Sequence, residues 1–151
     1  MNIRPATDAD SAAIKRLIYG VLGEYGLRPD PDATDKDLDS IERTYRDNGS
    51  YFGVVEEQGR IVATVALLRI DEATCELRKM YVLADQRGRG LGRQLLTLAL
   101  DKARQAGFKR VVLETASPLY EAIALYRRFG FRAYQPDHMS CRCDQAMELY
   151  L

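Results

Sequence analysis

The stretch Gln86-Arg87-Gly88-Arg89-Gly90-Leu91-Gly92 decides the fold of this chain, because it joins a predicted strand to a predicted helix through three glycines and two arginines. Residues 76–83 contain the aromatic and β-branched side chains typical of a strand, and from residue 91 the apolar residues recur at helical spacing. The glycines therefore lie where a helix begins. The first amides of a helix have no intrahelical acceptor, so this turn presents hydrogen-bond donors to a ligand.

The residue types in this turn favour an anion. Glycines leave room for an anion to reach the amides, and arginines add full charges to the partial positive charge of the helix dipole. The residues concerned are Gly88, Gly90 and Gly92 with Arg87, Arg89 and Arg93. A pyrophosphate fits this arrangement best. The turn lacks the closing Gly-Lys-Ser/Thr of a Walker loop and the spacing of a dinucleotide fingerprint, and a plain strand-to-helix connection is the alternative.

Length and composition limit the possible functions. With 151 residues, 46% of them hydrophobic and 29% charged, the chain is expected to form one domain over residues 1–151. Twenty-two basic residues balance twenty-two acidic ones, so no overall field attracts nucleic acid or a membrane surface. No apolar run approaches the roughly 20 residues that a bilayer requires. The first residues lack the apolar core of a secretory signal, so we expect a cytoplasmic protein, as a monomer or homodimer.

The cysteines do not indicate a structural or metal site. Cys75, Cys141 and Cys143 are odd in number and are not spaced like a disulfide framework, which is typical of a reducing compartment. His138 with Cys141 and Cys143 would make a cramped metal cluster without a fourth ligand. We therefore expect no metal.

Hydrophobic periodicity predicts a mixed α/β fold. Three adjoining strands from residue 51 to residue 83, with a hairpin at 57–60, form an antiparallel meander, and the strand at 110–114 should run parallel to the last of them. A helix opens after Thr7-Asp8, which would cap it. Strands are expected at 2–6, 51–56, 61–68, 74–83, 110–114, 131–135 and 146–151, and helices from residue 9 through 21, between 36 and 46, from 91 to about 107, and at 119–129.

Two linked motifs resemble the GNAT N-acetyltransferases. The loop Arg87-Gly88-Arg89-Gly90-Leu91-Gly92 is similar to the Arg/Gln-x-x-Gly-x-Gly/Ala acyl-CoA loop of that family. The segment Ala124-Leu125-Tyr126-Arg127-Arg128-Phe129-Gly130-Phe131 is similar to its Ala-x-x-Leu-Tyr-x-x-x-Gly-Phe motif, in the right order and at the right distance. Residues 3–7, 76–82 and 147–149 also resemble family members, so the resemblance covers nearly the whole chain.

The resemblance implies a GNAT-like fold that binds acetyl-CoA as cosubstrate. Its sheet is mixed and mostly antiparallel, with helices on both faces and a splayed pair of parallel strands that admits the pantetheine arm. The implied cofactor contacts are Met80, Tyr81, Val82, Arg87, Gly88, Arg89, Gly90, Leu91, Gly92, Arg93, Tyr126 and Arg128. An amide near Tyr81 would hold the oxyanion. Where the family often has an asparagine, this chain has Leu119, so a polar cofactor contact is lost or moved, and Arg128 either reaches the 3′-phosphate or is solvated.

Acetyl transfer to an amine requires a base for the ammonium proton, because an alkylamine is protonated at neutral pH. Glu76 is the candidate, since it lies eleven residues before Arg87, a spacing similar to that of the glutamate base in lysine-acetylating members of the family. Strand alternation also puts Glu76 on the same face as Arg78, so a surface ion pair is the alternative. Glu114, at the end of the neighbouring strand, is the second candidate for the base.

Tyr126 is the predicted general acid. A phenol titrates near pH ~10, close enough to a thiol at ~8.5 to protonate a departing thiolate. The resemblance assigns this role to the tyrosine of the second motif, which here is Tyr126 and not Tyr120. The alternative is a core aromatic residue, because Ile123 and Tyr126 also fit an apolar helical stripe.

The acceptor is expected to be a small amine or amino acid. The acidic segment Asp30, Asp32, Asp35, Asp37 and Asp39 is typical of a solvated approach to a helix, although a cationic amine would also be attracted to it. Two other functions fit the sequence less well. An acyl-CoA-binding sensor without catalysis would not need both Glu76 and Tyr126, and a nucleotide-binding domain would need a magnesium carboxylate after the loop, which is missing.

Overall fold

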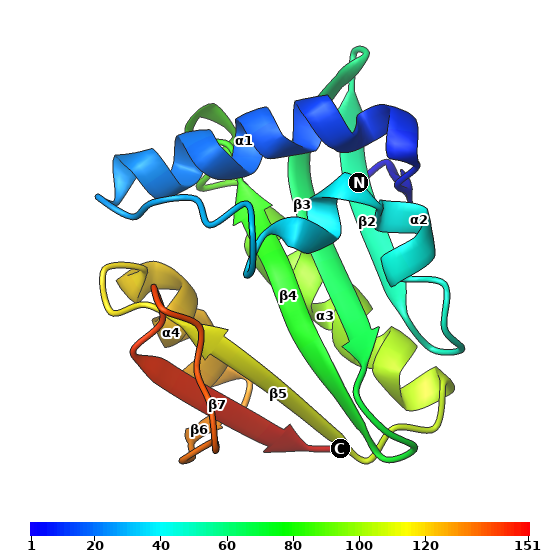
Figure 1. Cartoon of the computed structure of the whole chain (residues 1–151), viewed down its shortest axis with the longest axis vertical. Helices are drawn as coiled ribbons and strands as arrows, with labels where there is room; N and C mark the ends of the chain where they lie inside the picture. Colours follow the sequence, from blue (N-terminus) through cyan, green and yellow to red (C-terminus); the bar gives the residue numbers. More distant parts are fainter.

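The computed structural model describes residues 1–151 and contains one seven-stranded sheet in the order β1-β2-β3-β4-β5-β7-β6 (Figure 1). All neighbouring strands are antiparallel except β4 and β5, which are parallel, as the sequence predicted. The strands are β1 Ile3–Pro5, β2 Tyr51–Glu57, β3 Arg60–Arg69, β4 Thr74–Val82, β5 Arg110–Thr115, β6 Arg132–Ala133 and β7 Gln145–Tyr150.

Four α-helices flank the sheet, together with three short 3-10 helices. The α-helices are α1 Ser11–Glu24, α2 Ile41–Thr44, α3 Leu91–Gln105 and α4 Tyr120–Arg128, and the 3-10 helices are η1 Asp8–Asp10, η2 Lys36–Asp39 and η3 Ala84–Gln86. Figure 1 shows α1 in front of the sheet and α3 behind it. None of these helices combines the length and the apolarity needed to cross a membrane.

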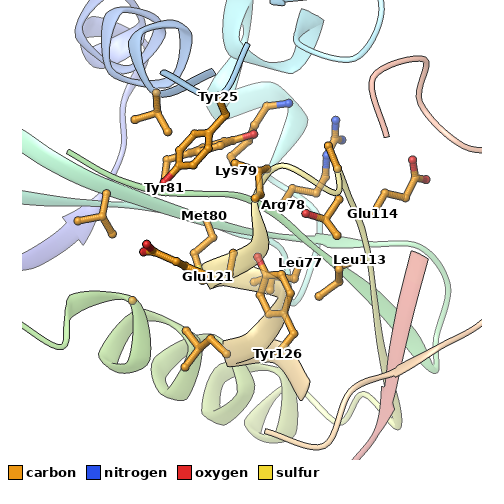
Figure 2. A pocket seen from close by; sticks show the side chains of 18 of the residues that line it. Tyr25, Leu77, Arg78, Lys79, Met80, Tyr81, Leu113, Glu114, Glu121 and Tyr126 are labelled. Carbon is orange, nitrogen blue, oxygen red and sulfur yellow. The ribbon is translucent and has the colours of Figure 1, made fainter. Parts of the chain in front are cut away.

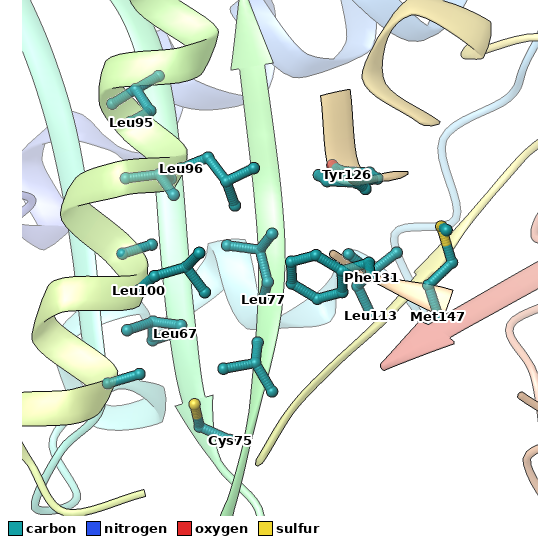
Figure 3. Close-up of a cluster of buried hydrophobic side chains, with 14 of the residues drawn as sticks. Leu67, Cys75, Leu77, Leu95, Leu96, Leu100, Leu113, Tyr126, Phe131 and Met147 are labelled. Carbon is teal, nitrogen blue, oxygen red and sulfur yellow. The ribbon is translucent and has the colours of Figure 1, made fainter. Parts of the chain in front are cut away.

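Each face of the sheet has its own core. On the α3 and α4 face, Leu95 and Leu96 of α3 pack with Leu77 of β4, Leu113 of β5 and Tyr126 of α4 (Figure 3). On the other face, the buried side of α1 packs with residues of β2, β3 and the segment around α2. Because alternate residues of a strand point to opposite faces, the neighbours of Leu77 and Leu113 in sequence point to the α1 face.

Local sequence explains the turns that hold this sheet. The β2–β3 hairpin turns at Gln58 and Gly59, whose φ angles of 52° and 75° are those of a left-handed two-residue turn that matches the strand twist. The amide of Thr7 donates a hydrogen bond to the Asp10 carboxylate at 2.8 Å, so the predicted cap is at Thr7, one short turn before α1.

Two predicted elements differ in the structure. The helix expected between residues 36 and 46 is split into η2 and α2, because Ser40, with φ −145° and ψ 69°, leaves the helical conformation between them. The strand expected over residues 131–135 is reduced to Arg132–Ala133. Pro136 follows closely and has no amide hydrogen to donate, which limits the pairing with β7.

Candidate active site

The two parallel strands separate soon after they begin to pair. β4 and β5 are in register only at Thr74 with Arg110, Cys75 with Val111, and Glu76 with Val112. Beyond Glu76 the edge of β4 that faces β5 has no strand partner, and a cleft of about 600 Å³ opens there. The predicted splayed pair is therefore confirmed.

A β-bulge helps to separate the strands. The β3–β4 register shifts between Thr64 and Ala66, and Lys79 lies opposite this shift with a φ angle of 50°. The hydroxyl of Thr64 donates a 2.7 Å hydrogen bond to the carbonyl of Lys79 and holds the bulge. A residue other than glycine in the left-handed region is strained, and such strain persists only where surrounding contacts hold it.

The loop before α3 carries free hydrogen-bond donors at the mouth of this cleft. The amides of six consecutive residues, from Gly88 to Arg93, donate to no backbone or side-chain acceptor of the protein. Gly88 and Gly90 have φ angles of 79° and 81°, which only glycine adopts easily, whereas Gly92 already lies inside the helix with an ordinary φ. The first two glycines are therefore required by backbone conformation.

The arginines of the site do not all face a ligand. Arg87 donates from Nε to the carbonyl of Val82 at 3.0 Å, pairs with Glu24 at 2.9 Å and stacks over Tyr25, so it ties the loop to α1 and β4. Arg89 pairs with Glu57 at 3.3 Å. The side chains of Arg93 and Arg128 also line the cleft, are exposed and have no ion-pair partner, so they are free to contact an anion.

Tyr126 lies in the core and also lines the cleft. Its ring is buried, 5.8 Å from that of Phe131, as expected of a core residue. Its hydroxyl has no protein hydrogen-bond partner and is directed toward β4 in the cleft (Figure 2). Burial, together with the nearby phenol of Tyr81, raises the pKa of Tyr126 above its ordinary value of 10.0. The hydroxyl is therefore protonated at neutral pH and able to donate.

The two candidate bases lie on the opposite face of the sheet, around the same opening. The Glu76 carboxylate lies 3.5 Å from Nε of Arg78, so the expected pair exists, but inside the cleft and not on the outer surface. Burial raises the pKa of Glu76, the charge of Arg78 opposes this, and Glu114 raises it further. One oxygen of Glu114 accepts hydrogen bonds from the amide and hydroxyl of Ser140 at 2.7 and 2.9 Å.

The interpretation of the acidic segment as a solvated or amine-attracting surface is wrong for Asp35 and Asp37. Both are buried. Asp35 is bound by both guanidinium nitrogens of Arg142 at 2.7 Å and by Lys79 at 2.9 Å, and Asp37 accepts a 2.5 Å hydrogen bond from Tyr45. Burial alone would raise the pKa of Asp35, but the hydrogen bonds from Arg142 and the contact with Lys79 hold it well below its ordinary value.

Sequence reasoning did not single out Lys79, Arg142 or Ser140 as parts of the site. Only Lys79 left a signal, because Arg78-Lys79 places two successive cations in a strand whose residues otherwise alternate between apolar and polar, a pattern that favours a bulge. Leu119 lines the cleft just before α4, where its side chain supplies no hydrogen bond to the helix start. The loss of a polar cofactor contact at this position stays a prediction.

Comparisons with known proteins agree with this geometry. A family model described as "Acetyltransferase (GNAT) family" matches residues 17–131. The chain is 38% identical over 157 residues to the Escherichia coli (strain K12) protein named "Uncharacterized N-acetyltransferase YjgM", covering 97% of this chain and 94% of that one.

Solved structures share the fold. A GNAT-family acetyltransferase from Staphylococcus aureus Mu50 superposes with a TM-score of 0.91 at 22% identity, covering 99% of this chain and 98% of that one. The putative acetyltransferase yncA from Salmonella typhimurium, solved with its cofactor acetyl-CoA, has a TM-score of 0.75 at 24% identity, with coverages of 99% and 92%. The predicted fold class is confirmed.

Proposed function

Since the chain belongs to the acetyltransferase (GNAT) family, we propose that it transfers an acetyl group from acetyl-CoA to the primary amine of a small molecule or amino acid. The amine attacks the thioester directly while both substrates are bound. The observation that carries this proposal is the run of six amides without an acceptor at the start of α3, beside a cleft between parallel strands. Such donors suit a diphosphate.

The residues around the cleft fit the parts of acetyl-CoA. The amides from Gly88 to Arg93 donate hydrogen bonds to the diphosphate, and the free guanidinium groups of Arg93 and Arg128 can pair with the remaining phosphate charge. The unpaired edge of β4 at Met80–Val82 offers peptide groups to the amides of the pantetheine arm. Acetyl-CoA supplies the activated acyl group, and the protein supplies orientation and proton transfer.

Glu76 removes the proton from the acceptor ammonium. The pKa of Glu76 is raised toward neutral pH, so its carboxylate is a stronger base than that of an exposed glutamate. Glu114 faces the same opening and is the alternative base, but one of its oxygens is occupied by Ser140. The neutral amine then attacks the thioester carbonyl through the gap between β4 and β5.

Tyr126 protonates the leaving sulfur. As the carbon–sulfur bond breaks, its electron pair goes to sulfur and the phenolic proton of Tyr126 follows. The attacking nitrogen loses its remaining extra proton as it becomes an amide, and the phenolate regains this proton through solvent. Burial raises the pKa of the phenol, which keeps it protonated until the sulfur leaves. A backbone amide near Tyr81, on the open edge of β4, stabilises the oxyanion.

Direct attack is favoured over an acyl-enzyme. An acyl-enzyme would need a nucleophilic side chain in the cleft, and Cys143 is the cysteine that lines it. Burial and the charge of Glu114 raise the pKa of this thiol. A protonated thiol is a poor nucleophile, so Cys143 is not suited to carry the acetyl group.

The test is the release of free thiol from acetyl-CoA in the presence of a panel of amines, with Tyr126→Phe as the variant and Tyr120→Phe as its control. Tyr120 lies on the same helix but is 65% exposed. We expect Tyr126→Phe to lower kcat by about a hundredfold or more, as loss of a general acid does. Tyr120→Phe should keep wild-type turnover, and calorimetry should give both variants the wild-type affinity for CoA.

One outcome would reject this function, and another would reject only the role of Tyr126. Binding of acetyl-CoA without thiol release to any amine would favour a non-catalytic acyl-CoA sensor. Undiminished turnover of Tyr126→Phe would leave the transferase activity in place but remove Tyr126 from its mechanism.

A further inference from the structure

Two arginines on the α1 side of the cleft differ in whether a carboxylate of the protein occupies their guanidinium group. Arg142 already binds a carboxylate in its fork, because both of its terminal nitrogens lie 2.7 Å from the two oxygens of Asp35, and its side chain is only 10% exposed. Arg78 makes a single hydrogen bond, of 3.1 Å, to the carbonyl of Thr34. The two side chains therefore differ in their capacity to bind a ligand.

No carboxylate of the protein occupies the fork of Arg78. Its distances to Glu76 and Asp37 are 3.5 and 3.8 Å, which are ion-pair contacts longer than hydrogen bonds. The next residue, Lys79, reaches Asp35 at 2.9 Å and Asp37 at 3.4 Å and so takes over the neutralisation of these aspartates. A guanidinium group has five donors, so Arg78 keeps most of its donors for another partner.

The position of Arg78 indicates whether its free donors face the cofactor or the acceptor. Arg78 lines the cleft on the α1 face, whereas its neighbour Leu77 packs in the core on the α3 face, together with Tyr126. The free amides that suit the phosphates of CoA lie at the start of α3. Arg78 is therefore on the side from which the acceptor approaches.

The group beside Arg78 is a carboxylate, which binds a cation where Arg78 binds an anion. Glu76 lies next to Arg78 on the same face of β4, with 3.5 Å between the carboxylate and the guanidinium group. A ligand that engages both must carry an amine and an anionic group close together. The ammonium and carboxylate of an α-amino acid are separated by one carbon and meet this condition, whereas a simple alkylamine leaves Arg78 without a partner.

We propose that the acceptor is an α-amino acid, whose carboxylate binds the guanidinium group of Arg78 while its amino group lies at Glu76. This assignment rests on the proposed function, because it names the substrate class of that reaction. Arg78 is then the residue that determines specificity, and its planar fork can hold a carboxylate through two hydrogen bonds.

The first test uses the wild-type protein and matched sets of acceptors. Each set contains an α-amino acid, its carboxamide and the amine that lacks the carboxyl group, for example leucine, leucinamide and 3-methylbutylamine, with alanine, methionine, phenylalanine and glutamine sets beside it. In the set that is turned over best, we expect kcat/KM for the acid to exceed that for the other two by about ten- to a hundredfold, as for hydrogen bonds to a charged group.

The outcomes separate this assignment from the function on which it rests. Carboxamides or simple amines that react as well as the acids would overturn the assignment and leave the acetyltransferase function standing. No thiol release with any member of the panel would overturn both.

The second test compares Arg78→Gln and Arg78→Lys with wild type on the preferred acid and its carboxamide. We expect Arg78→Gln to lower kcat/KM for the acid about ten- to a hundredfold more than for the carboxamide, mainly through KM, because any change in the pKa of Glu76 acts on both acceptors alike and cancels in this ratio. Arg78→Lys, which keeps the charge but not the fork, should fall between the two. Equal losses on acid and carboxamide would mean that Arg78 only supports the local structure, and would overturn its role in recognition.

Discussion

The two sides of the cleft are built from different parts of the chain. On the α3 side, the loop from Gly88 to Arg93 offers backbone amides of consecutive residues. On the α1 side, Asp35 joins Lys79 and Arg142, which come from three separate segments. The first side depends on local backbone conformation, and the second depends on charges that meet only after folding. The first is therefore suited to a constant cofactor, and the second to a specific acceptor.

The largest effect that would test this contrast is expected from Asp35→Asn. This change leaves Lys79 and Arg142 buried without their shared carboxylate, and removing one partner from a buried ion pair costs about 3–5 kcal/mol. Urea unfolding measures the loss, and Asp32→Asn, at an exposed position of the same segment, is the control. A loss below about 1 kcal/mol would mean that the network does not stabilise the acceptor side.

The next effect concerns the pH dependence of the acceptor side. Because burial raises the pKa of Glu76 above its ordinary value of 4.5, the wild-type kcat/KM should fall with decreasing pH at a point above pH 4.5, where the base becomes protonated. Glu76→Gln should remove this acidic limb and lower kcat/KM by about a hundredfold near neutral pH. The loss should shrink at alkaline pH, where more of the amine is already neutral.

A comparison of Glu76→Gln with Glu114→Gln shows which carboxylate causes the acidic limb of the pH profile. Glu72→Gln, on an exposed turn, should keep the wild-type profile. If Glu114→Gln loses the limb while Glu76→Gln keeps it, Glu114 is the base. If both variants keep it, neither carboxylate takes the proton.

The same contrast explains what the sequence predicted well. The glycine-rich turn before α3, the parallel pair and the position of Tyr126 were all predictable, because each depends on a short stretch whose residue types and spacing are visible in one dimension. Gly88 and Gly90 are examples, since their positive φ angles are a local requirement. The place of Tyr126 at the cleft was predicted in the same way, from a single helical motif, while its role as general acid stays a prediction.

The acceptor side was mostly not predictable, because its charges are paired through the fold. Nothing in the order of residues indicates that Asp35 meets Arg142, and without that contact the acidic segment resembles a solvated one. The free donors of Arg78 could not be predicted for the same reason, because they depend on which aspartates pair with Lys79. Only the adjacent cations in β4 indicated the bulge in advance.

The smallest effect tests whether the α3 side depends on backbone conformation, as the comparison requires. Gly90→Ala places a side chain at a φ of 81°, which costs about 1–2 kcal/mol, and we expect the affinity for CoA to fall about five- to thirtyfold as the amides shift. Gly92→Ala is the matched control, because its added Cβ would lie 3.6 Å from Leu125, an ordinary contact, at a helical φ.

Calorimetric titration with CoA compares the two glycine variants directly. The prediction is a clear loss for Gly90→Ala and an affinity close to wild type for Gly92→Ala, with both proteins folded. A larger loss for Gly92→Ala would mean that clearance between the helix start and the ligand, and not the left-handed conformation of the loop, governs binding. In that case the amides would be presented by the helix alone, and the turn before it would serve only as a connection.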